Sequence, residues 1–185
     1  MMKPKPLCLD DNAMWKQRYR APTIAWAQIA RSNPLRGIVT STKTGKYQLY
    51  AWNVRSGGLR QLTHRPEGTV FGVISPNGHY VYYLLDEGGN EIGHFVRLPW
   101  EGGEEEDITP AMAPYSAFGL SISSAGNMIG STFSDDSGFH AVLLLVGRRG
   151  DIGVPRELHR NTKMIFGPSL SYGGEIGVIT STERT

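Results

Sequence analysis

The sequence is short of cysteine and of long apolar runs, and each shortage excludes a class of protein. Cys8 is the only cysteine among the 185 residues, so neither an internal disulfide framework nor a CxxC metal or redox motif can form. No stretch approaches the roughly 18 consecutive apolar residues of a membrane span. The N-terminal MMKPKPLCLDDNAMW also lacks the apolar core of a signal peptide. We therefore expect a cytoplasmic protein that is neither secreted nor embedded in a membrane.

Charge of one sign is scarce as well. The 19 Lys and Arg residues exceed the 17 Asp and Glu residues only slightly, and the basic residues are scattered without a dense patch interleaved with aromatics. Nucleic-acid binding is therefore not indicated. The sequence is instead rich in turn residues, with 23 glycines and 11 prolines but no collagen period. Many turns between short elements favour an all-β protein.

An internal repeat organises the chain. VISPNG at Val73 to Gly78 is echoed by SISSAG at Ser121 and SLSYGG at Ser169, with a spacing of 48 residues each time. A Phe-Gly pair precedes each copy, and the motifs RQLTH, EDITP and RELHR recur between the copies. A β-sandwich with accidental similarity explains these coincident landmarks less well than a true repeat does.

Each repeat reads as four antiparallel strands. In the second copy the predicted strands are TVFGVIS, YVYYLLD, IGHFVRLP and DIT, and Asn77-Gly78 supplies a two-residue hairpin turn. Four-stranded units at this period are typical of β-propeller blades. We expect the Gly of each Phe-Gly pair to lie in an inner strand, where the lack of a Cβ permits close approach. Aromatic residues that alternate along the strands are interpreted as packing between blades: Tyr47, Tyr50, Trp52, Tyr80, Tyr82 and Tyr83.

The predicted fold is therefore an all-β partial propeller of about three and a half blades. Residues 1–22 form an N-terminal extension, and the blades cover about 23–66, 67–113, 114–161 and, for the start of a fourth, 162–185. The extension contains a short predicted helix over DDNAMWKQRY, with Asp10 or Asp11 near its N-terminus. Pro22 ends this helix because it disfavours the α conformation at Ala21.

Several of these strings resemble the N-terminal propeller of prolyl oligopeptidase family serine peptidases, especially the acylaminoacyl peptidase and dipeptidyl aminopeptidase-like branch. The strings are WKQRYRAPTIAWAQIA, GGLRQLTH, GVISPNGHYVYYLLDEGGNEIGHF and EEEDITP. The resemblance extends over essentially the whole chain, although the blade pattern also occurs in the Tol-Pal propeller. It implies about seven blades and a C-terminal α/β-hydrolase domain with a Ser-Asp-His triad, which this chain lacks. It also implies that the propeller limits the size of peptide substrates, and that the N-terminal helix reaches the hydrolase domain.

Candidate nucleophiles fall at repeated positions. Ser121 and Ser169 stand in G-x-S-x-S strings, whereas the nucleophile elbow of an α/β-hydrolase needs Gly at the fifth position and a strand-to-helix turn. Because both serines occupy equivalent repeat positions, we interpret them as strand residues. The sequence therefore predicts no catalytic residue in this chain.

Metal and cofactor sites are not indicated either. The five histidines show no HxH or HExxH spacing: His64, His79, His94, His140 and His159. The acidic run Glu101 to Asp107 lacks the alternating spacing of a calcium loop and is interpreted as solvated. Acidic residues in equivalent loops fit turn chemistry: Asp86, Glu87, Asp135 and Asp136. We expect no metal ion and no cofactor.

Two functions remain open at this point. The chain is either the non-catalytic propeller segment of a peptidase, with peptide substrates and a C-terminal hydrolase domain as partners, or a free-standing propeller that binds a peptide or protein. In either case an open blade edge at the last strand, EIGVITST, is expected to favour self-association.

Overall fold

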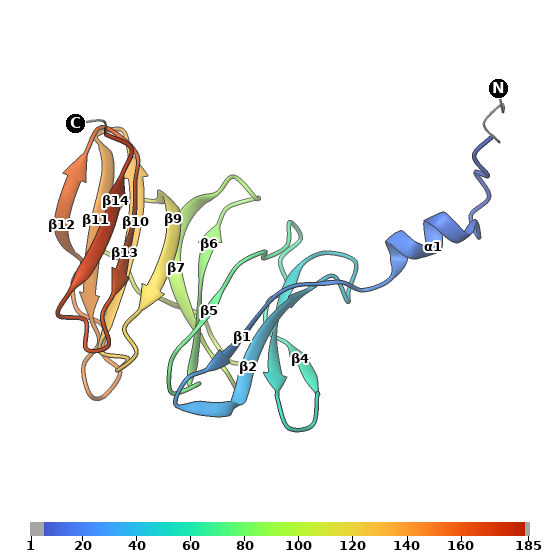
Figure 1. Ribbon diagram of the computed structural model, residues 1–185, viewed down its shortest axis with the longest axis horizontal. Coiled ribbons are helices and arrows are strands. Elements are labelled where there is room, and N and C mark those ends of the chain that lie inside the picture. The colour runs from blue at the N-terminus through green and yellow to red at the C-terminus, as the bar shows by residue number, and fades with distance from the viewer. Residues whose placement is uncertain (1–5, 184–185) are drawn as a thin grey trace.

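The computed structural model describes residues 6–183, in which one short helix precedes a succession of antiparallel β-sheets (Figure 1). The predicted extension 1–22 and the predicted start of a fourth blade, 162–185, each run into residues outside this range, at 1–5 and 184–185. No helix among the described residues is long and apolar enough to cross a membrane.

Helix α1 (Met14–Arg20) begins later than the sequence predicts. Asp10 does not cap it. Its carboxylate Oδ1 instead accepts a hydrogen bond from the backbone N–H of Asn12 at 2.7 Å, which shapes the turn before the helix. The prediction that Pro22 ends the helix is confirmed, because Ala21 is extended with φ −65° and ψ 131°. No residue of α1 is buried, and the helix stands away from the sheets in Figure 1.

The first blade is a four-stranded sheet with its strands paired in chain order. The strands are β1 (Ile24–Ala30), β2 (Asn33–Ser41), β3 (Gln48–Asn53) and β4 (Leu59–Gln61). β1 is the least covered of them, since most of its residues are exposed.

The second and third blades join into one eight-stranded sheet. The second has β5 (Val73–Ile74), β6 (Tyr80–Asp86), β7 (Ile92–Pro99) and β8 (Glu106–Asp107). The third has β9 (Tyr115–Ile122), β10 (Met128–Asp135), β11 (Gly138–Leu145) and β12 (Arg156–Asn161). The junction is short: Ile92 pairs with Ser116 and Gly93 with Tyr115.

The fourth unit is a two-stranded sheet of β13 (Ile165–Leu170) and β14 (Gly177–Ser181), and it packs against β9, β10 and β11. The predicted fold class, a partial propeller of four-stranded antiparallel blades with a short N-terminal helix, is confirmed. The first strand of the second blade is shorter than predicted, because only Val73 and Ile74 of TVFGVIS pair with β6.

Apolar side chains hold neighbouring blades together. One cluster lies between the first two blades and includes Ile38, Leu49 and Tyr83, while a second lies between the second and third blades and includes Tyr82 and Ile129. Since successive strand residues face opposite sides of a sheet, Tyr82 and Tyr83 enter different clusters. The predicted role of these two tyrosines in packing between blades is confirmed.

Trp100, which directly precedes the acidic run Glu101 to Asp107, packs between two blades. Its side chain is buried, and the indole Nε1 donates a hydrogen bond to the Gly37 carbonyl of the first blade at 2.8 Å. The Arg36 guanidinium lies over the indole, 4.5 Å from the ring centroid. Trp100 therefore links the second blade to the first.

The glycines of the Phe-Gly pairs do not all serve the predicted purpose. A Cβ on Gly72 would lie 2.7 Å from Leu49 Cδ1, so close approach explains that glycine. A Cβ on Gly119 would meet nothing within 4 Å, and the expectation of crowding there is wrong. Gly119 has φ +107°, a conformation that side-chain-bearing residues rarely adopt.

Candidate functional site

The two predicted serines lie in strands, as their repeat positions indicated. Ser121 is in β9, where its hydroxyl donates to the carbonyls of Gly130 and Pro168, and Ser169 is in β13 with an exposed side chain. Neither serine is hydrogen-bonded to a histidine within residues 6–183. Both lack the base that a serine nucleophile needs.

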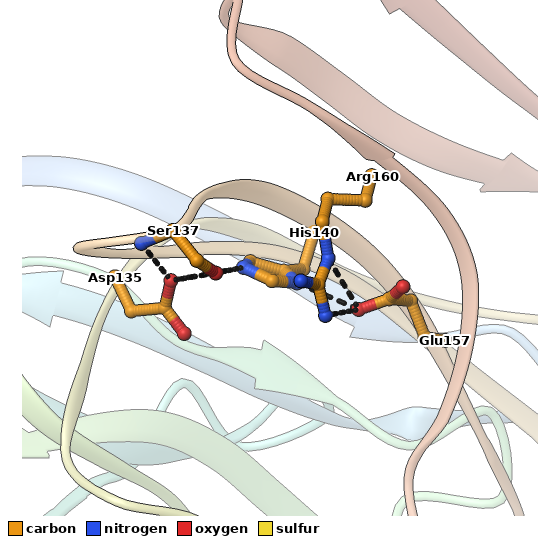
Figure 2. A network of polar contacts seen from close by, with 5 residues as sticks. All are labelled: Asp135, Ser137, His140, Glu157 and Arg160. Atoms are coloured by element: carbon orange, nitrogen blue, oxygen red, sulfur yellow. Dashed lines mark hydrogen bonds and ion pairs between the residues drawn. The ribbon is translucent and has the colours of Figure 1, made fainter.

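A histidine network at the outer part of the third blade was not predicted (Figure 2). His140 Nδ1 lies 2.7 Å from Glu157 Oε2, and His140 Nε2 lies 3.0 Å from both Ser137 Oγ and Asp135 Oδ1. Arg160 completes the network with a 3.0 Å ion pair to Glu157. The imidazole is buried and stacks on Phe133 with 4.7 Å between ring centroids.

The network links Ser137, His140 and Glu157 in the order of a catalytic triad, but its hydrogen bonds differ from those of a triad. The Ser137 hydroxyl donates to Asp135 at 2.6 Å. An ionised carboxylate only accepts hydrogen bonds, so His140 faces carboxylate acceptors at both ring nitrogens. Each ring nitrogen of His140 therefore has a carboxylate oxygen within hydrogen-bond distance, and the Ser137 hydroxyl is bonded to Asp135.

The second blade contains the same arrangement, which favours a structural role. His94 Nδ1 lies 2.8 Å from Asp107 Oδ2. Each histidine stands two residues before the position that pairs with its acid, since Val96 pairs with Asp107 and Val142 with Glu157. We call this contact the inter-strand clip, His94–Asp107 in one blade and His140–Glu157 in the next. It ties the third strand of a blade to the fourth.

The first blade replaces the clip with neutral groups. Gln48 occupies the histidine position, two residues before Tyr50, which pairs with Gln61. The Gln48 amide accepts from Thr63 Oγ1 at 2.8 Å and donates to the Arg65 carbonyl at 2.6 Å. The sequence held a signal for all three positions, because Gln61, Asp107 and Glu157 occupy the same place in the RQLTH, EDITP and RELHR motifs.

The remaining histidines are not brought into the network. His64, His79 and His159 have exposed side chains. No group of three or more His, Cys, Asp or Glu residues that could hold a metal ion occurs in the part of the chain that the structure describes.

The His140–Glu157 clip and the turn from Asp135 to Ser137 hold two carboxyl groups in their ionised form. Hydrogen bonds from the Ser137 hydroxyl and backbone N–H, and then from His140, lower the pKa of Asp135 to about 2. Hydrogen bonds from His140 and Arg160 lower the pKa of Glu157. A depressed pKa in the folded state adds stability above the unfolded value, and that stability is lost as the pH falls through the folded value.

We expect the Asp135 contribution to disappear between about pH 4 and pH 2. Urea unfolding of the wild type and of Asp135→Asn should therefore differ at pH 5 and converge as the pH falls to 2. Asp136→Asn is the matched control, because Asp136 is the exposed neighbour and makes no hydrogen bond or ion pair among the described side chains. A difference between the wild type and Asp135→Asn that stays constant over this range would contradict the assignment.

The acidic run is more ordered than a solvated loop. Glu101 pairs with Arg36 at 2.5 Å, and Glu106 pairs with Arg97 at 2.7 Å. Glu105 accepts from the Tyr83 hydroxyl and pairs with Arg65. Burial, and then the hydrogen bond to Glu105, raise the pKa of Tyr83. The run therefore attaches the second blade to the first, which corrects the sequence-based interpretation.

An open pocket lies where the first strands of three blades converge. It has a volume of about 440 Å³. We call it the axial pocket, and its lining residues are Trp26, Gln28, Ile29, Arg31, Phe71, Val73, Ile74, Pro76, Leu120, Ser121, Ile122 and Ser124. It is a candidate for a binding site, because large apolar side chains there remain open to solvent.

Two aromatic side chains form one wall of the axial pocket. Trp26 of β1 and Phe71 before β5 are 47% and 43% exposed, and their ring centroids are 6.4 Å apart. Arg31 follows β1 at the other end, where its Nη1 donates to Ser124 Oγ of the third blade at 2.5 Å. Arg31 is the only formally charged residue in the lining.

Comparison with known proteins agrees on the fold. No protein-family model matches the chain. A TolB-like protein from Agrobacterium tumefaciens aligns over 86% of this chain and 59% of its own, with a TM-score of 0.61 and 16% identity. An oligogalacturonate lyase in complex with manganese aligns over 77% of this chain and 41% of its own, with a TM-score of 0.58 and 13% identity.

A puromycin hydrolase aligns over 75% of this chain and 21% of its own, with a TM-score of 0.52 and 20% identity. The chain thus spans from 21% to 59% of the length of these three proteins. Proteins with different activities share the arrangement, so at these identities the likeness concerns the fold alone. The chain folds as part of a β-propeller of the kind found in TolB-like proteins and in propeller-bearing hydrolases.

Proposed function

We propose that the chain is the non-catalytic propeller segment of a prolyl oligopeptidase family serine peptidase, in the acylaminoacyl peptidase and dipeptidyl aminopeptidase-like branch. In this proposal it limits and positions peptide substrates for a C-terminal α/β-hydrolase domain of the same parent chain, in the cytoplasm. The observation that carries the proposal is the axial pocket, which offers an apolar wall to a ligand without any nucleophile–base pair beside it.

Two further findings support this function. The strings that resemble the peptidase propeller run through the blades, and a hydrolase is among the proteins with a similar fold. Three serines are candidate nucleophiles, and within the described part of the chain none of them donates its hydroxyl proton to a histidine base. Ser121 bonds to strand carbonyls, Ser137 donates to Asp135, and Ser169 lies exposed in β13.

A fluorophosphonate probe tests the non-catalytic assignment. We expect no labelling of Ser121, Ser137 or Ser169 by intact-mass and peptide mass spectrometry, because such probes react with serines that an adjacent base activates. An active serine hydrolase in the same reaction serves as the positive control. Stoichiometric labelling that Ser137→Ala or His140→Ala abolishes would show that the histidine network is a catalytic centre.

The second candidate function is a free-standing propeller that binds a peptide or protein. It is favoured by the likeness to the TolB-like protein, which has the highest TM-score of the three structures compared, 0.61. The coding sequence after Thr185 separates the two candidates. Further blades followed by a G-x-S-x-G serine would support the peptidase, whereas a closed ring followed by a stop codon would support the binding module.

A further inference from the structure

We propose that the axial pocket binds the carboxyl-terminal end of a short apolar peptide, with the terminal carboxylate on Arg31 and an aromatic side chain against Trp26 and Phe71. This inference rests on the proposed function and names its ligand class. The argument uses the charge of the pocket, the spacing of its two ends and the exposure of its aromatic wall.

The charge of the pocket favours an anion. Arg31 is exposed, and no carboxylate pairs with it among the described residues, where its one side-chain hydrogen bond is to the Ser124 hydroxyl at 2.5 Å. A guanidinium carries five N–H donors in a planar fork that matches a carboxylate. No Asp or Glu lines the pocket to compete for it. The remaining donors of Arg31 are therefore available to a ligand carboxylate.

The aromatic wall favours an apolar group on the same ligand. Trp26 and Phe71 keep nearly half of their surface exposed while they contact each other, so a third aromatic or large aliphatic side chain can cover them. Leu120 and Ile122 of β9 line the pocket as well. Covering such surface removes apolar area from water, which favours binding.

The distance between the two ends sets the length of the ligand. Trp26 and Arg31 are five residues apart along β1 and the turn that follows, which spans at most about 16 Å because β1 has a register shift between Ile29 and Ala30. The arginine side chain covers part of this distance. About three extended residues, at roughly 3.4 Å each, cover the rest. The aromatic residue of the ligand therefore stands about two positions before its free carboxyl group.

Three peptides test the assignment by isothermal titration calorimetry on the 185-residue chain. N-acetyl-Phe-Ala-Ala with a free carboxyl group should bind with a Kd in the range of about 0.1 to 1 mM, as expected for a ligand of this size. The same peptide with a C-terminal amide, and N-acetyl-Ala-Ala-Ala with a free carboxyl group, should each bind at least about tenfold more weakly.

Two variants assign the effect to the pocket. Arg31→Gln should abolish the preference for the free acid over the amide, whereas Trp26→Ala should weaken both Phe peptides. Arg55→Gln is the matched control, because Arg55 is an exposed arginine outside the axial pocket, and the variant should bind like the wild type. Thermal melts of each variant check that the fold is retained.

Equal affinity for acid and amide, or an Arg31→Gln variant that keeps the preference, would overturn the inference. Saturable binding of galacturonate but not of the peptides would also overturn it, in favour of a sugar acid. Failure here is distinct from failure of the proposed function. If neither peptide binding nor fluorophosphonate labelling is seen, only the proposed peptide ligand is wrong. If a serine is labelled, the non-catalytic assignment is wrong, whether or not the peptides bind.

Discussion

Replacing Gly93 by alanine is expected to destabilise the fold by about 3 kcal/mol, at the upper end of the usual cost of inserting a side chain into a packed interior. A Cβ at this position would lie 1.9 Å from the Leu85 carbonyl oxygen and 2.8 Å from Asp86 Cα. Both are backbone atoms of β6, so the clash is relieved only if β6 and β7 separate. Gly93 also pairs with Tyr115 at the junction of the second and third blades, so the disturbance would reach both.

Urea unfolding measures this effect, and Gly153→Ala is the matched control. A Cβ on Gly153 would lie 3.5 Å from Leu145 Cβ, an ordinary contact distance, so its midpoint should stay close to that of the wild type. Similar midpoints for the two variants would show that the β6–β7 pairing is looser than described.

The repeat made the fold predictable from the sequence, whereas the side-chain contacts between strands could not be predicted from it. Strands β6 and β7 match the predicted YVYYLLD and IGHFVRLP, because alternation and turn residues are local signals. Gly93 belongs to no repeated motif. It must be glycine because a Cβ there would clash with the backbone of the neighbouring strand β6. Gly119 belongs to a repeated motif, yet its surroundings are open and only its backbone conformation requires glycine.

The histidine network shows what spacing rules overlook. His94 and His140 lie in no short motif with metal-ligand or catalytic spacing. Their acids are 13 and 17 residues away along the chain, and antiparallel pairing of the third and fourth strands brings them together. Comparing equivalent positions across the repeats, where His94 and His140 each have an acid in the next motif, would have revealed the clip.

The axial pocket was the least predictable feature. Trp26, Phe71 and Leu120 come from three different repeats, and each reads locally as an ordinary strand or strand-flanking residue. Only the convergence of β1, β5 and β9 places them around one space. Arg31 gave no signal at all, since a single arginine in a turn is common on protein surfaces.

Self-association of the 185-residue chain through its last strand is expected to change its mass in solution. Within residues 6–183, β14 pairs with β13 alone, so its other edge presents free backbone N–H and C=O groups. Apolar side chains accompany this edge, with Ile176 and Val178 exposed by 65% and 62%. A charged side chain on an edge strand opposes pairing, so Val178→Lys should reduce association. Val154→Lys carries the same change at an 81% exposed position outside the strands and should not.

Size-exclusion chromatography with light scattering, over a range of protein concentrations, tests most directly whether the chain is an open section of a propeller. We expect the wild type and Val154→Lys to exceed the monomer mass of 20.4 kDa increasingly as concentration rises, and Val178→Lys to remain near it. A wild-type chain that is monodisperse at 20.4 kDa at every concentration and unfolds only at high temperature would contradict the open propeller.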